Sequence, residues 1–234
     1  MNNSNQIYTN ANESGLNRFF SKMYGFMAGA VAFSALIAYL CSTVFQAQVM
    51  NLFGHGFAFL FLFVFQIAMV FAVSFKPNRS AASSITILFV FAGIEGLFLS
   101  SVLMVFAISQ VTMAFVAASA DFIVLSIFGA TTKKDLSGIG RQAFAALIAL
   151  FIVMFINMFL QSPLISYVFS FAGVVIFTIL TAWDTQTFKA MYLQYGDQVN
   201  STSLAVSGAL QLYLDFINLF LQLLSIFSGG GSKR

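Results

Sequence analysis

Apolar residues in this chain form long runs that are separated by short polar loops. Seven runs, at about 23–45, 52–75, 83–107, 111–130, 143–160, 164–187 and 204–227, each come near the length that a helix needs to cross a bilayer. The pattern predicts an all-α fold, a polytopic membrane helix bundle with seven transmembrane helices. The bundle is expected over 23–227, between a polar N-terminal tail at 1–22 and a C-terminal tail at 228–234.

The last apolar run carries a periodic set of polar residues. They recur three or four positions apart, which places them on one face of a helix: Ser207, Gln211, Asp215, Asn218, Gln222 and Ser225. Such a stripe is expected to face protein or water, because lipid cannot satisfy its hydrogen bonds. Asp215 lies near the middle of the run, where an acid costs roughly 3 kcal/mol on insertion scales. The sequence therefore predicts that something offsets this cost.

Composition defines the class of protein. Of the 234 residues, 60% are hydrophobic and 7% are charged, whereas a soluble domain carries about 25% charged residues. The net charge of +3 comes from basic residues in short loops, so nucleic acid is not an expected partner. The single cysteine, Cys41, excludes an intrachain disulfide. No loop is long enough for a soluble catalytic domain, so we expect a non-enzymatic protein without cofactors that functions within its bundle.

The loops alternate in charge. Basic residues lie in the N-terminal tail and in every second loop: Arg18, Lys22, Lys76, Arg79, Lys133, Lys134, Arg141 and Lys189. The positive-inside rule then predicts a cytoplasmic N-terminus. Seven crossings would leave the C-terminal tail outside, which Lys233 and Arg234 oppose, so a re-entrant last segment is the alternative. We expect a bacterial cytoplasmic membrane, with the endoplasmic reticulum as the alternative.

Four acidic residues lie within predicted spans, and no lysine or arginine lies deep in any of them: Glu95, Asp121, Asp184 and Asp215. Such acids must be protonated, share a proton, meet water or bind a cation. Adjacent antiparallel helices can bring Asp184, near a cytoplasmic end, close to Asp215, which lies roughly 16 Å into the last helix. Two adjacent carboxylates cannot both ionise at low cost, so the pair is expected to act as a proton-controlled switch and a hard-cation site. The alternative is that each acid is neutral and only joins helices.

Two further features favour structural roles. His55, the only histidine, lies in a GHG sequence near the outer end of the second run, and it is expected at the interface rather than on a metal. Small residues recur at spacings of three and four at Gly93, Gly96 and Ser100, which suits close helix packing.

Several stretches of the chain resemble the Bax inhibitor-1 family of membrane proteins. They are FTILTAWDTQ in the sixth run, LYLDFINLF in the seventh, AGIEGLFLSS in the third and the KKDLS loop. The resemblance implies a seven-helix bundle with the last helix central, and a pH-sensitive calcium leak across the membrane. It further implies that Asp184 and Asp215 share a proton, gate the pore and hold calcium transiently as the permeant ion.

Further candidate residues lie outside the pair, and the resemblance gives a role to one of them. A basic residue after the second helix is implicated in the closed state, and Lys76 or Arg79 would be its counterpart here. The candidate pore-lining residues are Glu95, Asp121, Gln211 and Asn218. The expected partners are therefore the lipid bilayer, calcium ions and protons.

Two other functions fit a chain that lies within the membrane. An intramembrane aspartyl protease would use aspartates on consecutive helices, but its second aspartate follows Gly-x-Gly, whereas LYL precedes Asp215. No feature of the sequence excludes a non-conducting scaffold that binds partner membrane proteins. A metal-dependent hydrolase is disfavoured by the single histidine.

Overall fold

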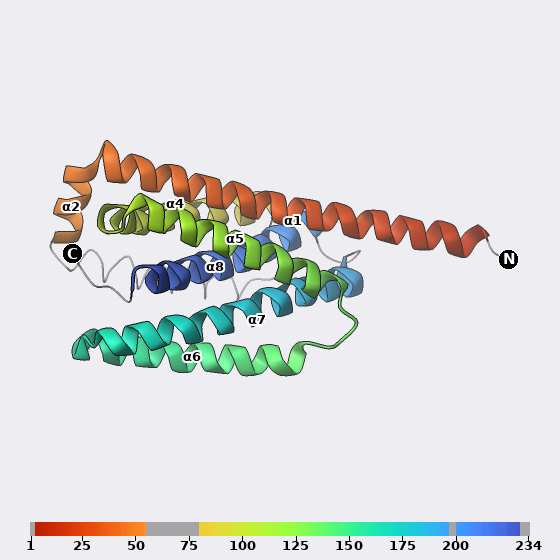
Figure 1. Ribbon diagram of the computed structural model, residues 1–234. Helices are drawn as coiled ribbons and strands as arrows, with labels where there is room; N and C mark the ends of the chain where they lie inside the picture. Colours follow the sequence, from red (N-terminus) through yellow and green to blue (C-terminus); the bar gives the residue numbers. More distant parts are fainter. Residues whose placement is uncertain (1–2, 55–79, 197–199, 230–234) are drawn as a thin grey trace. The chain divides into compact units, whose positions relative to one another are not determined.

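The computed structural model describes residues 3–54, 80–196 and 200–229, and within these ranges it contains helices and no strands (Figure 1). The helices are α1 (Asn3–Thr43), α2 (Gln46–Gly54), α4 (Ala81–Val105), α5 (Ile108–Thr131), α6 (Ser137–Leu160), α7 (Pro163–Tyr195) and α8 (Ser201–Phe227). The predicted all-α fold is confirmed.

Six of the described helices are long and apolar enough to cross a membrane, namely α1, α4, α5, α6, α7 and α8. They coincide with six of the predicted runs. The remaining run, 52–75, lies mostly outside the described residues, as do His55, Lys76 and Arg79. Helix α8 is the most buried of the six, because 50% of its most apolar stretch is buried, against 17% to 33% in the others. This burial agrees with the expected inner position of the last helix.

Two helices extend beyond their predicted ends. Helix α1 begins at Asn3 rather than near residue 23, and α7 continues to Tyr195 rather than ending near residue 187. An apolar run marks only the part of a helix that suits lipid, while helical hydrogen bonding continues into polar sequence. Asp184 therefore lies roughly 16 Å before the end of α7, at 1.5 Å per residue, and not near a helix end as the predicted run indicated.

Polar side chains accept hydrogen bonds from residues at the start of α6 and of α8. At the start of α8, Asn200 Oδ1 accepts hydrogen bonds from the backbone N–H groups of Thr202 and Ser203, at 3.0 and 3.1 Å. At the start of α6, Asp135 Oδ1 accepts from the Ser137 N–H at 2.9 Å and from the Ser137 hydroxyl at 2.6 Å. These two bonds lower the pKa of the Asp135 carboxyl below its ordinary value.

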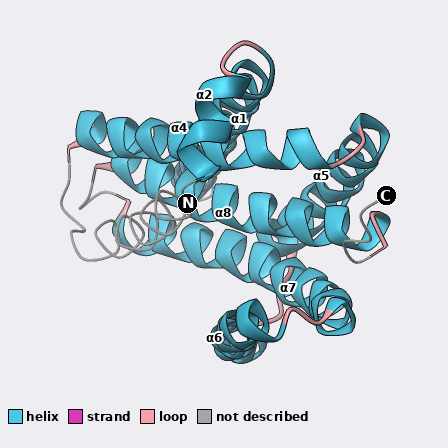
Figure 2. Cartoon of the chain, turned by 90° about the vertical axis from the view of Figure 1, so that its left-hand side faces the viewer, coloured by secondary structure: helices cyan, strands magenta, loops and turns pink. Residues whose placement is uncertain are grey.

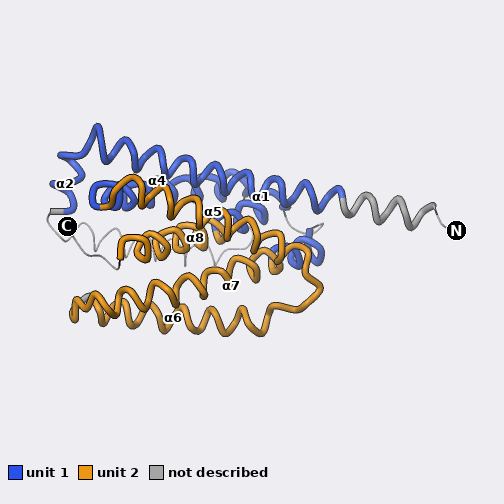
Figure 3. The backbone as a smooth tube through the Cα atoms, in the orientation of Figure 1, with its two compact units in different colours: residues 1–105, 188–210 blue, residues 106–187, 211–234 orange. Residues whose placement is uncertain are grey.

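The chain divides into two compact units (Figure 3). Unit 1 comprises residues 1–105 and 188–210, and unit 2 comprises residues 106–187 and 211–234. The boundaries fall within α7 and α8, so each unit contains one part of each of these two helices.

Unit 1 is built on the contact between α1 and α4. A Cβ atom at Gly96 would lie 2.6 Å from the backbone oxygen of Ser34 and 2.7 Å from Cβ of Ile37, so only glycine permits this approach. The predicted role of Gly96 in close helix packing is confirmed. The start of α8 is joined to α1 by a hydrogen bond of 3.1 Å from Lys22 Nζ to Thr202 Oγ1.

Unit 2 contains α5, α6 and the parts of α7 and α8 that carry the two aspartates. Helices α5 and α8 pack through edge-to-face aromatic contacts, because the Phe216 ring lies 5.6 Å from Phe115 and 5.8 Å from Phe122. Helices α7 and α8 lie side by side (Figure 2). Unit 2 therefore places the helices of the two candidate gate residues in direct contact.

Candidate functional site

Helix α7 carries Asp184 in a buried stretch that contains hydroxyl residues. Asp184 is 6% exposed, and Thr181 and Thr185 are fully buried. The Thr181 hydroxyl donates to the backbone oxygen of Phe177 at 2.8 Å. The Thr185 hydroxyl, by contrast, has no hydrogen-bond partner among the described residues. This part of α7 thus places an acid and an available hydroxyl away from solvent.

Helix α8 carries Asp215 in its most buried part. Asp215 is 2% exposed, and Leu212, Phe216 and Leu219 around it are also buried. The helix continues without interruption through this position to Phe227. An acid is therefore held within a regular, apolar segment, and its environment is set by the helices that pack on it.

The side chains of Asp184 and Asp215 interact directly within unit 2. Gln211, which lies one helical turn before Asp215, also hydrogen-bonds Asp184. The Oδ2 atom of each aspartate has no hydrogen-bond partner within the described ranges. Ionised carboxylates accept hydrogen bonds but cannot donate them, so contact between these two groups is favourable only when at least one of them holds a proton.

The pair supplies oxygen ligands but not a complete metal site. In the described part of the chain, no group of three or more His, Cys, Asp and Glu side chains is arranged to hold a metal ion. A calcium ion takes six to eight oxygen ligands. Two carboxylates would therefore need hydroxyl, carbonyl or water oxygens beside them to complete a calcium site.

Part of the polar stripe of α8 faces α7, which agrees with the prediction that the stripe faces protein or water. The hydroxyl oxygens of Ser170 and Ser225 form a hydrogen bond of 2.7 Å. The Gln222 side chain lies in the space that a side chain at Gly173 would need. Further along the same two helices, Gln211 of the stripe forms a hydrogen bond with Asp184. Protein, and not lipid, therefore surrounds the polar face of α8 at these levels.

Just beyond Asp184, one glutamine ties α7 to the loop between α5 and α6. Gln186 Nε2 donates to the backbone oxygen of Lys134 at 2.8 Å, and its Oε1 accepts from the Leu136 N–H at 2.9 Å. The loop is thus fixed to α7 two residues after the acid. Sequence reasoning missed Gln186, because a polar residue near the end of a predicted span is usually solvated.

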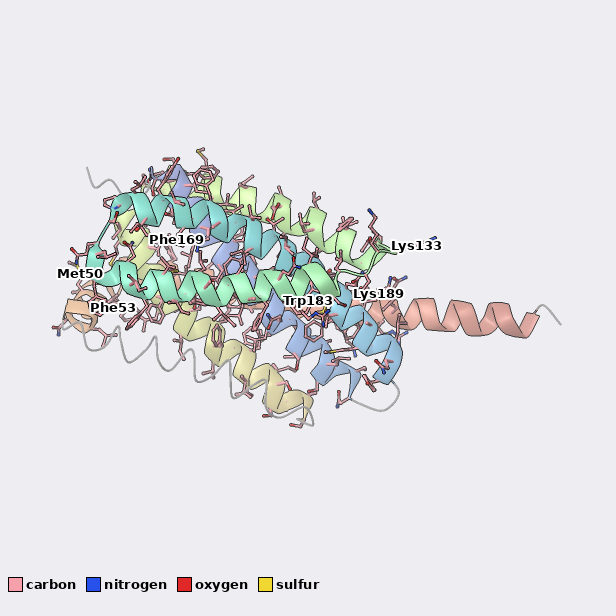
Figure 4. The ribbon with its side chains drawn as sticks, turned by 90° about the horizontal axis from the view of Figure 1, so that it is seen from below. Met50, Phe53, Lys133, Phe169, Trp183 and Lys189 are labelled. Atoms are coloured by element: carbon pink, nitrogen blue, oxygen red, sulfur yellow. The ribbon has the colours of Figure 1, made fainter. Side chains whose placement is uncertain are left out.

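Trp183, the only tryptophan of the chain, precedes Asp184 and packs on α6. A Cβ atom at Gly140 of α6 would overlap its indole ring. Trp183 lies toward the end of unit 2 that carries Lys133, whereas Phe169 lies toward the opposite end (Figure 4). Any rotation of α7 at Asp184 would therefore change the surroundings of the indole.

The remaining candidate pore-lining residues have different environments. Asp121 is half-buried on α5, and its Oδ2 accepts a hydrogen bond of 2.9 Å from Thr178 of α7. Asn218 follows Asp215 on the stripe and donates to the backbone oxygen of Leu214 at 2.7 Å. Glu95 is half-buried on α4, in the other unit from the aspartate pair. The structure therefore brings together Asp184, Asp215 and Gln211.

A family model described as "Inhibitor of apoptosis-promoting Bax1" matches residues 16–232 of the chain. The chain belongs to the Bax inhibitor-1 family. The resemblance seen in the sequence is confirmed over nearly the whole length of the protein. The Bax inhibitor-1 family is a family of membrane proteins and not a known enzyme family, in agreement with the six apolar helices.

Similar proteins occur in several bacteria. YrjE of Lactococcus lactis is 37% identical over 234 residues, covering 99% of each chain. Inner membrane protein YbhL of Escherichia coli is 36% identical over 225 residues, covering 94% of each chain. An uncharacterized membrane protein of Streptococcus pyogenes serotype M3 is 36% identical over 226 residues, which cover 96% of this chain and 98% of the relative. These Bax inhibitor-1 relatives establish the class of protein and its membrane location.

Proposed function

We propose that this Bax inhibitor-1 protein is a pH-sensitive calcium leak in which Asp184 and Asp215 form the gate. The observation that supports this function most strongly is the direct contact between two buried acids on adjacent helices. Burying acids in a membrane protein is costly. Each acid also keeps one oxygen that has no hydrogen-bond partner in the described part of the chain. Acids that only joined helices would be expected to use all of their acceptors.

The gate would work through a shared proton. While the proton is present, the pair carries at most one negative charge and joins α7 to α8. When the proton leaves, two like charges face each other at low dielectric and repel strongly. The helices then separate at this level, and the carboxylate oxygens become available to calcium, which prefers hard oxygen ligands. The leak should therefore increase as pH rises through the titration of the pair.

We place this leak in a bacterial cytoplasmic membrane, with the N-terminus in the cytoplasm. The alternation of basic and uncharged loops supports this topology, and a relative is named an inner membrane protein. The basic residue expected to take part in the closed state, Lys76 or Arg79, lies outside the described residues.

Calcium flux from proteoliposomes, measured across a pH series, tests the proposed gate. Asp184→Asn and Asp215→Asn should each remove most of the pH dependence of the calcium flux, because neither variant has two carboxylates that could share a proton. Asp135→Asn is the matched control, since this acid lies in the loop before α6 and asparagine keeps its acceptor oxygen. A wild-type pH profile in both pair variants would contradict the proposal.

Measurements on the same vesicles distinguish the calcium leak from the scaffold and from the intramembrane protease. A scaffold would show no calcium flux at any pH, and the double Asp→Asn variant would still retain its partner membrane proteins. An intramembrane protease would cleave a transmembrane peptide and lose this activity in either variant. The unbroken course of α8 through Asp215 gives the protease little support.

A further inference from the structure

The polar stripe of α8 continues past Asp215 toward the Ser162 end of unit 2, the end at which the turn between α6 and α7 lies. Asn218, Gln222 and Ser225 follow Asp215 at spacings of three and four. The gate as proposed does not use them. Leucine at each position would suit a membrane helix better, because burying an amide or hydroxyl is costly without full compensation. These residues therefore require an explanation of their own.

Helix α7 follows the stripe in one antiparallel register along this length. The α7 positions in contact are Asp184, Gly173 and Ser170, and their α8 partners, in the same order, are Gln211, Gln222 and Ser225. The α7 numbers fall by the same steps as the α8 numbers rise, as continuous contact between antiparallel helices requires. The stripe and α7 therefore form one continuous seam. We define the seam as Ser170 and Gly173 of α7 with Asn218, Gln222 and Ser225 of α8.

The contact between Gln222 and Gly173 closes the seam. A Cβ atom at Gly173 would lie 2.7 Å from both Cγ and Cδ of Gln222, and 3.1 Å from its Nε2. The glutamine thus fills a notch that only glycine leaves open. An ion could pass this level only after the Gln222 side chain had moved. A glutamine does so by rotating about its side-chain bonds, whereas a backbone contact would require the helices themselves to shift.

Polar groups continue from this contact to the end of the helices. Ser170 and Ser225 share their hydrogen bond one turn further along. Nearer the turn, Asn157 Nδ2 donates to Ser166 Oγ at 2.8 Å, and Asn157 Oδ1 accepts from the Ser162 N–H at 3.1 Å. The seam and these residues provide oxygen and nitrogen atoms at successive levels between the aspartate pair and the Ser162 end of unit 2.

We propose that the seam is the path of water and cations between the Ser162 end and Asp215, and that Gln222 seated on Gly173 is a second constriction on this path. The inference rests on the proposed calcium leak and names the half of its route that the aspartate pair does not control. Oxygen atoms of Asn218, Gln222 and Ser225 would replace part of the hydration shell of the passing ion, as pore-lining oxygens do in channels.

Cysteine accessibility tests the path without any ion flux. In a Cys41→Ser background, which removes the only native cysteine, single cysteines are placed at Asn218, Gln222 and Ser225. Vesicles of known orientation then receive a membrane-impermeant, cationic thiosulfonate on one side at a time. The matched controls are Leu219→Cys and Leu224→Cys, which lie among the seam positions on the same helix and are 0% and 1% exposed.

The seam cysteines should react at least about tenfold faster than the two leucine controls, a difference in barrier of ~1.4 kcal/mol. Reaction should be fastest at Ser225→Cys, and it should occur from the Ser162 side. Ser225→Cys changes one atom, so it keeps the test valid if a larger substitution misfolds. Equal reactivity of seam and control positions, or reaction only from the opposite side, would overturn the proposal.

Flux measurements test the constriction. Gln222→Ala should raise calcium flux. Gln222→Leu should lower the flux roughly tenfold, which corresponds to an increase of ~1.4 kcal/mol in the barrier. In both variants the pH at which the flux is half-maximal should stay that of the wild type. Flux unchanged in both variants would overturn the constriction. Accessible seam cysteines without pH-dependent flux would support the path and contradict the aspartate gate. A pH-gated flux with unreactive seam cysteines would support the aspartate gate and contradict the path.

Discussion

The Trp183 indole lies so close to Gly140 that a Cβ atom at position 140 would overlap the ring. This contact joins α7 to α6 immediately beside Asp184. Because Trp183 is the only tryptophan of the protein, its fluorescence reports on one place, the level of the proposed gate. The contact therefore supplies both a test of packing and a signal for the state of the gate.

Gly140→Ala should destabilise the protein by about 1–3 kcal/mol, because the added methyl group must displace the indole or separate the helices. The change should also shift the Trp183 emission. Gly138→Ala is the matched control on the same helix, since no atom lies within 4 Å of a Cβ atom added there. Alanine at that exposed position should stabilise α6 slightly. Thermal unfolding in detergent measures both; equal unfolding temperatures would show that the Trp183 contact is not tight.

Trp183 emission should titrate together with calcium flux. Loss of the shared proton separates α7 from α8 at Asp184, so the adjacent indole should enter a more polar environment as pH rises, and its emission should move to longer wavelength. Asp215→Asn should abolish this shift although residue 215 is on another helix, whereas Asp135→Asn should leave it intact. Emission that follows pH equally in Asp215→Asn would mean that another group causes the change.

Gln186→Leu should weaken the attachment of the α5–α6 loop to α7. The substitution leaves the part-buried Leu136 N–H without its glutamine partner, a loss of about 1 kcal/mol, whereas the exposed Lys134 carbonyl can bond water instead. Gln186→Glu should have a smaller effect, because a carboxylate still accepts from the Leu136 N–H. Hydrogen exchange at Leu136 measures the difference; equal protection in both variants would exclude a role for the acceptor oxygen.

The stability contributed by Asp135 should depend on pH. Its pKa is lowered by the hydrogen bonds from Ser137, so the folded protein favours the ionised form. The stabilisation is therefore complete above the ordinary value of 3.8 and is lost as pH falls through the lowered folded value. Asp135→Ala should lower the unfolding temperature at neutral pH and have less effect in strong acid. An effect that did not change with pH would argue that the charge of Asp135 contributes nothing.

The sequence predicted those features that depend on hydropathy and on helical periodicity. Transfer of about 20 apolar residues into lipid dominates all local preferences, so the spans were recognisable without knowledge of their neighbours. The stripe on α8 followed from spacings of three and four. The contact between Asp184 and Asp215 was expected for a similar reason, because two acids deep in adjacent helices have few other ways to offset their burial.

Features that depend on the axial register of one helix against another, or on the contacts of a loop, could not be predicted. The place of Gln222 beside Gly173 requires the axial register of α7 against α8, and no periodicity within one helix specifies that register. Gln186 was missed because its partners are backbone groups of a loop. The extension of α7 to Tyr195 was missed because hydropathy falls where the helix leaves lipid, although its hydrogen bonding continues.

The uninterrupted course of α7 has a mechanical consequence. With 33 residues it is a rod roughly 50 Å long, attached at one extremity by the Ser170–Ser225 bond and near the other by Gln186. A stiff rod cannot bend at one level alone, so a tilt of a few degrees about the Ser170–Ser225 bond that frees Asp184 must also displace the attachment at Gln186. A ligand bound to the loop at Lys134 would hinder this tilt and so slow the gate without contacting the aspartates.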